Sequence, residues 1–169
     1  MPRTFNPTDI NGAQPNELEI TWQFLKRRFK TIRPLKHISN PATGDIRERT
    51  QALILKGFNI PNDINPIGIE VVIKGQRNGR ICDEIIQLWY QGELIGDNNF
   101  FYITDADGHL KITNESTYGG PTNTWGTELT STILSDPEFG IMIKFQSHPY
   151  YPHNDAMILD SVSLTVYEE

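Results

Sequence analysis

Cysteine is almost missing from this sequence of 169 residues, and long apolar runs are missing altogether. Cys82 is the single cysteine, so an internal disulfide is excluded. Small secreted domains usually carry paired cysteines, and this count therefore favours folding in a reducing cytoplasm. No stretch approaches the ~20 apolar residues that a helix needs to cross a bilayer. Residues 1–6 also lack the apolar core of a signal peptide. We expect no membrane partner.

Basic residues are outnumbered by acidic residues, 15 to 21, which gives a formal net charge of −6. This balance argues against a nucleic-acid-binding surface for the protein as a whole, and we predict no nucleic-acid partner. The local exception is the stretch Lys-Arg-Arg-Phe-Lys at residues 26–30, which Arg33 and Lys36 extend. Such a cluster can contact phosphate or an acidic partner protein. A run of this kind is more often a solvated strand edge or loop.

Helical periodicity is also missing, whereas alternation with a period of two recurs along the chain. Apolar side chains alternate in residues 67–74, 139–145 and 156–167, which predicts strands with one buried face. In residues 80–90 the same alternation predicts that Ile81, Ile85 and Trp89 share a face with Asp83. Thirteen glycines and eleven prolines supply the turns between many short strands.

These patterns predict an all-β fold, a jelly-roll-like antiparallel β-sandwich that forms one domain over residues 20–169. Residues 1–19 have no usable periodicity and are broken by prolines, so we expect an extended N-terminal arm there. The arm is too poor in apolar side chains to fold alone. We hypothesise that it runs over a neighbouring subunit or another protein of an assembly, with Phe5 and Ile10 in shallow apolar pockets. Its deletion is then expected to leave the sandwich folded.

The loop at residues 118–126 (Tyr-Gly-Gly-Pro-Thr-Asn-Thr-Trp-Gly) sets one large aromatic residue beside paired glycines. Glycine lacks Cβ and lets another group approach the backbone closely. We therefore predict that Trp125 is mostly buried, wedged between Gly119, Gly120 and the sandwich. A turn at Asp136 then leads into the strand at residues 139–145.

Two loops carry side chains that metal ions bind. The first loop, Asp105-Ala-Asp-Gly108, places alternating carboxylates before a glycine, as calcium loops do. It lacks the third oxygen ligand of such a loop. Asp-Gly is also a common signal for a hairpin turn. Residues 148–153 (His-Pro-Tyr-Tyr-Pro-His) could ligate a metal or stack on a sugar ring. We favour a turn for the first loop. For the second we favour packing of Tyr150 and Tyr151 on the sandwich rim or on a neighbouring subunit. No cofactor or metal is predicted.

Catalytic patterns are sparse. Asp83 and Asp160 interrupt apolar strand faces and could form a carboxylate pair for acid/base chemistry. The favoured interpretation is that each accepts hydrogen bonds from loop backbone at a strand end. Cys82 is expected to be a small core residue rather than a nucleophile. The sequence shows no nucleophile elbow, phosphate-binding glycine loop or zinc-protease motif, and we predict that the protein is not an enzyme.

Read as a block, residues from about 50 to 167 resemble a jelly-roll-like domain of tailed-bacteriophage structural proteins and related bacterial surface or repeat proteins. The resemblance runs through residues 58–61, 67–73, 83–88, 118–120, 125–126, 136–141 and 159–167, in that order. It implies a structural and often oligomeric role in a virion, and no catalytic residues. The basic stretch, the N-terminal segment and residues 98–118 depart from the pattern.

The resemblance implies a bacteriophage virion structural protein, such as a tail, baseplate, neck or capsid-accessory component. Its expected partners are other virion proteins and further copies of itself, and it is expected to be assembled in the host bacterial cytoplasm. The residues expected at its assembly interface are Phe5, Ile10, Arg27, Arg28, Tyr150 and Tyr151. The alternative is a carbohydrate-binding jelly-roll module that binds a glycan through Trp125, Tyr150 and Tyr151. Aromatic residues should be exposed and coplanar for a sugar, but buried in a core or interface for assembly.

Overall fold

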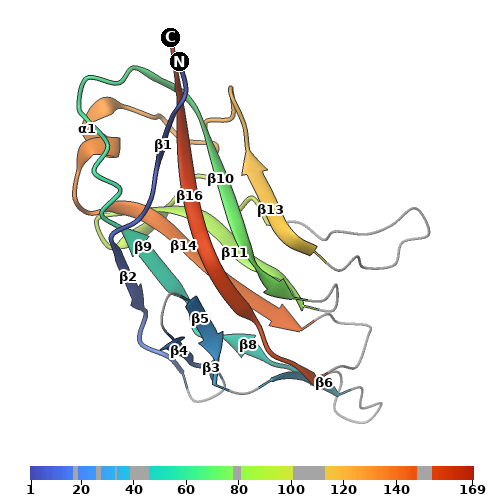
Figure 1. The fold of residues 1–169 in the computed structure, drawn as a ribbon. Coiled ribbons are helices and arrows are strands. Elements are labelled where there is room, and N and C mark those ends of the chain that lie inside the picture. The colour runs from blue at the N-terminus through green and yellow to red at the C-terminus, as the bar shows by residue number, and fades with distance from the viewer. Residues whose placement is uncertain are drawn as a thin grey trace.

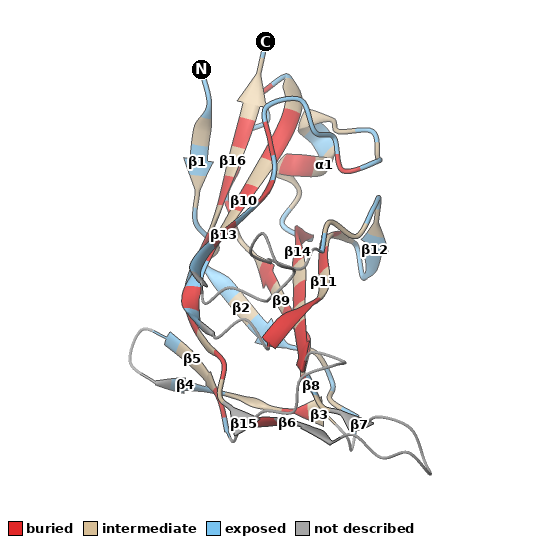
Figure 2. Ribbon diagram, turned by 90° about the vertical axis from the view of Figure 1, so that its right-hand side faces the viewer, coloured by how far each residue is buried: buried red, intermediate tan, exposed pale blue. Residues whose placement is uncertain are grey.

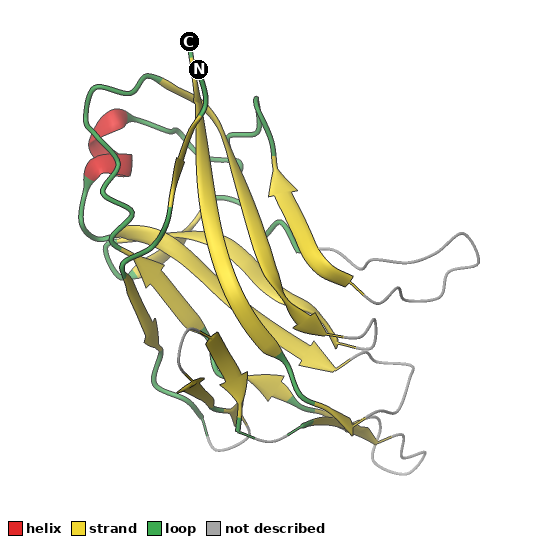
Figure 3. Ribbon diagram, in the orientation of Figure 1, coloured by secondary structure: helices red, strands yellow, loops and turns green. Residues whose placement is uncertain are grey.

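The computed structural model describes residues 1–16, 19–25, 28–32, 34–38, 46–77, 81–100, 113–147 and 154–169. In these residues two large antiparallel sheets pack against each other (Figures 1 and 3), which confirms the predicted all-β antiparallel sandwich. The one helix of this part of the chain, α1 (Ser131–Ser135), is short. Its N-cap residue Thr130 accepts a hydrogen bond from the backbone N–H of Ile133 at 3.2 Å.

Strand order fixes which strands form the edges of the sandwich. The first sheet holds, in spatial order, β13 (Thr113–Gly119), β10 (Pro66–Arg77), β16 (Ile158–Glu168), β5 (Arg28–Thr31) and β4 (Trp22–Leu25), with β1 (Arg3–Phe5) also paired to β16. The second holds β12 (Glu93–Ile95), β11 (Ile81–Tyr90), β14 (Phe139–Ser147), β8 (Arg49–Thr50) and β3 (Glu19–Ile20), with β9 (Leu53–Lys56) paired to β14 and β2 (Asp9–Gly12) to β9. A small third sheet holds β15 (Asn154–Asp155), β6 (Leu35–Ile38) and β7 (Ile46–Arg47).

The core lies between the two large sheets and follows the period-two pattern of the sequence. In β14 the four predicted inward side chains, Phe139, Ile141, Ile143 and Phe145, are all buried. The central strands β10 and β16 contribute further buried aliphatic residues to the same cluster (Figure 2). Alternation works here because successive side chains of a strand point to opposite faces of its sheet.

Strand β11 departs from the predicted alternation. Its pairing with β14 shifts by one residue between Asp83 and Ile85, which marks a β-bulge. Ile86 and Leu88 are buried beyond the bulge, whereas Ile85 and Trp89 are only half-buried. The predicted face that joins Ile85 and Trp89 to Asp83 is therefore wrong, because the extra residue of a bulge reverses the faces that follow it.

The N-terminal segment is extended, as predicted, but it lies on its own chain. Strand β1 pairs with β16 in the first sheet, and β2 pairs with β9 in the second. Arg3 also binds Glu168 at 2.8 Å, which holds the two ends of the chain together. The segment thus occupies edge positions in both sheets of its own chain and is not a free arm, whereas its contact with a neighbouring subunit stays a prediction. Edge strands expose unpaired backbone groups, and the chain's own N-terminal residues satisfy them here.

Trp125 is fully buried, as the 118–126 loop predicted. Its indole N–H donates to the backbone oxygen of Ile69 at 2.9 Å. Gly119, at a positive φ of 78°, lies so close that a Cβ there would approach Trp125 Nε1 to 2.6 Å. The glycine therefore permits the close approach of the indole ring, and the loop returns its aromatic side chain to the core.

Candidate functional site

Asp83 is the most buried carboxylate of the described residues, and it joins the two sheets. It lies in β11 just before the bulge, and its side chain is fully buried. Tyr118, at the end of β13 in the other sheet, donates its hydroxyl hydrogen bond to Asp83 Oδ2 at 2.9 Å. A buried carboxylate needs hydrogen bonds to offset the loss of its hydration. This contact comes from a side chain on a strand of the opposite sheet, and the expected bonds from loop backbone stay a prediction.

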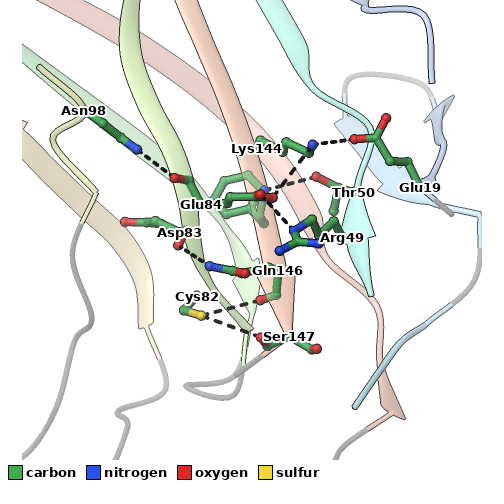
Figure 4. A network of polar contacts seen from close by, with 11 residues as sticks. Glu19, Arg49, Thr50, Cys82, Asp83, Glu84, Asn98, Lys144, Gln146 and Ser147 are labelled. Carbon is green, nitrogen blue, oxygen red and sulfur yellow. Dashed lines mark hydrogen bonds and ion pairs between the residues drawn. The ribbon is translucent and has the colours of Figure 1, made fainter. Parts of the chain in front are cut away.

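Cys82 belongs to the same polar group, shown in Figure 4. Its Sγ lies 3.6 Å from the backbone oxygen of Gln146, and the side-chain amide of Gln146 donates to the backbone oxygen of Asp83 at 3.4 Å. Gln146 Oε1 and Ser147 Oγ are buried without a hydrogen-bond partner. Polar groups in such positions commonly bind an internal water. Cys82 is buried, in agreement with its interpretation as a small core residue.

An ion-pair cluster covers the outer side of the second sheet (Figure 4). Lys144 of β14 pairs with Glu19 of β3 and lies 3.8 Å from Glu84 of β11. Glu84 in turn binds Arg49 of β8 at 2.8 Å. The cluster therefore joins four strands, one of which is the short N-terminal strand β3. Its lysine and Glu19 are largely buried, so solvent screens their interaction less than it screens a surface pair.

The pKa of Glu19 reflects this surrounding. Burial acts to raise its pKa, but the hydrogen bonds from Lys144 and from the backbone N–H of Asn16, together with the charges of Lys144 and Arg49, outweigh it. The net effect is a pKa below the ordinary value of 4.5. Glu19 is therefore held in its charged form, and its role is to fasten the N-terminal segment to the sheet.

Asp160 has a different surrounding from Asp83. It lies on β16 in the first sheet and forms an ion pair with Arg28 at 3.1 Å on the surface. The two carboxylates thus belong to different sheets and bind different partners, so their contacts do not make the acid/base pair considered above.

Among the described residues, no three His, Cys, Asp or Glu side chains gather closely enough to hold a metal ion. The loops 105–108 and 148–153 lie outside the described residues.

An apolar groove lies on the open flank of the sandwich, where edge strands of both sheets meet. A cavity of about 350 Å³ is lined by Pro7, Thr8, Ile10, Phe24 and Phe29. The first three come from β2 and the residues before it, and the two phenylalanines come from the β4–β5 hairpin (Figure 1). Phe24 is 63% exposed although its ring centre lies only 5.1 Å from that of Phe29. This groove is the candidate functional site.

The hairpin that carries the groove is held by Trp22. The Trp22 ring meets Phe145 of the core edge to face, with ring centres 6.2 Å apart. Its indole N–H donates to the backbone oxygen of Gln51 at 2.8 Å, and the Gln51 amide donates to the backbone oxygen of Ala13 at 2.7 Å. The base of the hairpin is therefore anchored, and Phe24 projects near its far end.

The structure places the predicted interface residues in three ways. Phe5 and Ile10 pack partly buried against the chain's own core, and Ile10 also lines the groove. Arg28 lies in the hairpin and pairs with Asp160. Arg27, Tyr150 and Tyr151, which were also predicted at the interface, lie outside the described residues. Phe24 was absent from the predicted interface.

Comparison with known proteins identifies no relative. No family model, no curated protein and no solved structure matches this chain. Within the described residues, no helix is long and apolar enough to span a membrane. The class that the fold defines is the all-β antiparallel sandwich, and its candidate functional features are the groove and the surfaces beside it.

Proposed function

We propose that this protein is a structural subunit of a larger assembly and acts through protein–protein contacts. The assembly we propose is a tailed-bacteriophage virion, to whose structural proteins the sequence is similar. The groove beside Phe24 is the observation that carries the proposal. Phe24 is a large aromatic side chain that is 63% exposed on an edge hairpin. Its burial by a partner would lower the free energy of the system.

The edge position of the hairpin supports the same proposal. β4 ends the strand order of the first sheet, so a partner strand can add beside it through backbone hydrogen bonds. The adjacent groove can then accept an apolar side chain of that partner. When a strand is added at a sheet edge in this way, the backbone hydrogen bonds provide the affinity, and the groove selects partners with a fitting apolar side chain.

The burial of the central aromatic residues also favours assembly over glycan binding. Trp125 is fully buried, and its indole N–H is bonded to Ile69, so neither face of its ring is available to a sugar. Tyr118 is likewise buried and bonded to Asp83. The glycan alternative therefore depends on Tyr150 and Tyr151 and stays a prediction about residues outside the described part of the chain.

Particle incorporation tests the proposal. Particles are purified from cells that produce them with wild-type chain, with Phe24→Ser, or with the control Ile32→Ser, whose residue is 56% exposed and does not line the groove. We expect wild type and Ile32→Ser in the particle fraction at equal amounts, and Phe24→Ser to be depleted while it stays folded in solution. A wild-type chain that is absent from particles would contradict the virion proposal.

A further inference from the structure

The charges of this chain are segregated along its sequence. Residues 20–44 contain six lysines and arginines and no acidic residue, whereas residues 81–143 contain ten acidic residues and a single basic residue, Lys111. The first block includes the β4–β5 hairpin, and the second includes β11, β12 and α1. The hairpin thus lies in the basic stretch of an otherwise acidic protein of net charge −6, and Arg28 and Lys30 are the basic side chains of this stretch that the structure describes.

The β4–β5 hairpin has two chemically different faces. Phe24 pairs with Phe29 across the hairpin, and both line the apolar groove. Arg28 and Lys30 flank Phe29 along β5, so they point to the opposite face, where Arg28 also pairs with Asp160 at 3.1 Å. A strand added beside β4 would therefore meet an apolar surface on one face and a basic surface on the other.

Strand β12 has the complementary pair of faces. It ends the strand order of the second sheet and is also an edge among the described strands. Glu93 is exposed and Leu94 is 39% exposed, and as neighbours in a strand they point to opposite faces. Asp97, just beyond the strand, is exposed as well. β12 thus offers an apolar side chain on one face and acidic side chains close to the other.

These two edges lie on opposite flanks of the molecule. Figure 2 shows β4 and β5 at the lower left and β12 at the right. The strand order agrees, since β4 lies on the flank of the groove and of β2, whereas β12 lies beyond β11 at the other end of the second sheet. One copy can therefore use both edges at the same time.

We propose that the β4–β5 hairpin of one copy docks against β12 of a second copy, with Phe24 on Leu94 and the basic face opposite Glu93 and Asp97. This inference rests on the proposed function and names the partner as the chain itself. Each copy contributes its hairpin to one neighbour and its β12 to the other. Such a head-to-tail contact is heterologous, so it builds a ring or an open filament rather than a closed dimer.

A second copy fits these observations better than a nucleic acid does. Phosphates would pair with Lys30 but would leave the apolar groove and Phe24 without an aliphatic counterpart, and Arg28 already pairs with Asp160. β12 supplies both the negative charge and the apolar side chain, and it places them on opposite faces as the hairpin requires. The charge match also disfavours hairpin-to-hairpin and β12-to-β12 contacts, because each would bring like charges together.

Sedimentation velocity on the full chain tests this arrangement over a range of concentration and salt. We expect wild type to associate in a concentration-dependent manner and to dissociate as salt rises, because salt screens the charge pairs. Phe24→Ser is expected to raise the dissociation constant by about tenfold or more, as loss of a central interface aromatic does. The control Glu169→Lys changes an exposed charge outside both blocks and should leave association unchanged.

A charge exchange gives the sharpest result. Lys30→Glu and Glu93→Lys should each weaken self-association, whereas the double variant, or an equimolar mixture of the two single variants, should restore it. Thermal melts confirm that every variant is folded. Wild type that stays monomeric while it still enters particles would overturn this inference and leave the proposed function standing. Association that none of the variants alters would overturn it too, as would Lys30-dependent binding of a single-stranded oligonucleotide by a monomeric chain.

Discussion

Trp125 fills the space between the 118–126 loop and β10, and its removal leaves a cavity that the surrounding strands cannot close. Trp125→Ala should lower the free energy of unfolding by about 3–5 kcal/mol, the usual cost of truncating a large buried aromatic residue. Trp125→Phe keeps most of the volume but loses the hydrogen bond to Ile69, which contributes about 0.5–1.5 kcal/mol. Urea unfolding measures both values. Equal stability of Trp125→Ala and wild type would show that the residue is not a core element.

Tyr118 provides the second prediction for a single residue. Tyr118→Phe removes the hydroxyl that binds the buried Asp83 carboxylate and leaves the ring in place. The loss should destabilise the protein by about 1–3 kcal/mol, because a buried acceptor loses a donor. Denaturant unfolding measures the change, with Tyr167→Phe as control, since the Tyr167 hydroxyl is only part-buried and lies 3.4 Å from Glu70. A smaller loss for Tyr118→Phe than for Tyr167→Phe would contradict the role assigned to Asp83.

At the scale of residues, the sequence predicted burial better than it predicted partners. The burial of Trp125 followed from its paired glycines, and that of Cys82 from its place in a strand. The bond between Asp83 and Tyr118 joins residues 35 positions apart on different sheets, and no local pattern encodes such a pairing. The exposure of Phe24 was not predicted, because alternation does not reveal where a sheet ends and a side chain loses its cover.

Among the elements, the central strands were predictable and the edge strands were not. Residues 67–74, 139–145 and 156–167 lie in central strands with one buried face, and the period of two predicts them. Strand β13 carries Asn, Glu, Ser and Thr, which are also common in loops, so the pattern gave no strand there. Strands β1 and β2 are edge strands of three and four residues, and their polar outward side chains made them resemble a free arm.

The pairing of β1 and β2 reverses the expectation for deletion of the N-terminal segment. Removing residues 2–12 takes one strand from each sheet and the partly buried side chains of Phe5 and Ile10 from the core. We therefore expect the thermal transition to fall by several degrees or to be lost. Thr4→Ala, which keeps the backbone pairing, serves as control. An unchanged transition after deletion would show that the segment contributes nothing to the sandwich.

The ion-pair cluster predicts how stability depends on pH. The pKa of Glu19 is lowered by folding, so its contribution to stability is present above about pH 4.5 and is lost as the pH falls through the folded-state pKa. Urea unfolding from pH 7 to pH 3 should therefore show the largest difference between wild type and Glu19→Gln at neutral pH. The two should converge on acidification. A difference that is constant across this range would contradict the assignment of a charged Glu19 bound to Lys144.

The whole molecule is a sandwich with an apolar groove beside Arg28 and Lys30 on one flank and with Glu93 and Asp97 on the other flank. The core explains why the chain folds, but it does not explain the exposed Phe24 or the separation of charge along the sequence. A second protein that covers the β4–β5 hairpin would bury Phe24 and pair with the charges beside it. The proposed assembly role rests on these surfaces, and the virion is part of that proposal.

Amide hydrogen exchange tests the central claim most directly, by comparing the isolated chain with the chain in its purified assembly. The account predicts that protection increases at Trp22–Leu25 and at residues 7–10, where the edge strand and the groove would be covered. Residues 118–126 should exchange equally in both states, because that loop is already packed on the core. Unchanged exchange at β4 and the groove, with new protection elsewhere, would contradict the claim that this flank is the interface.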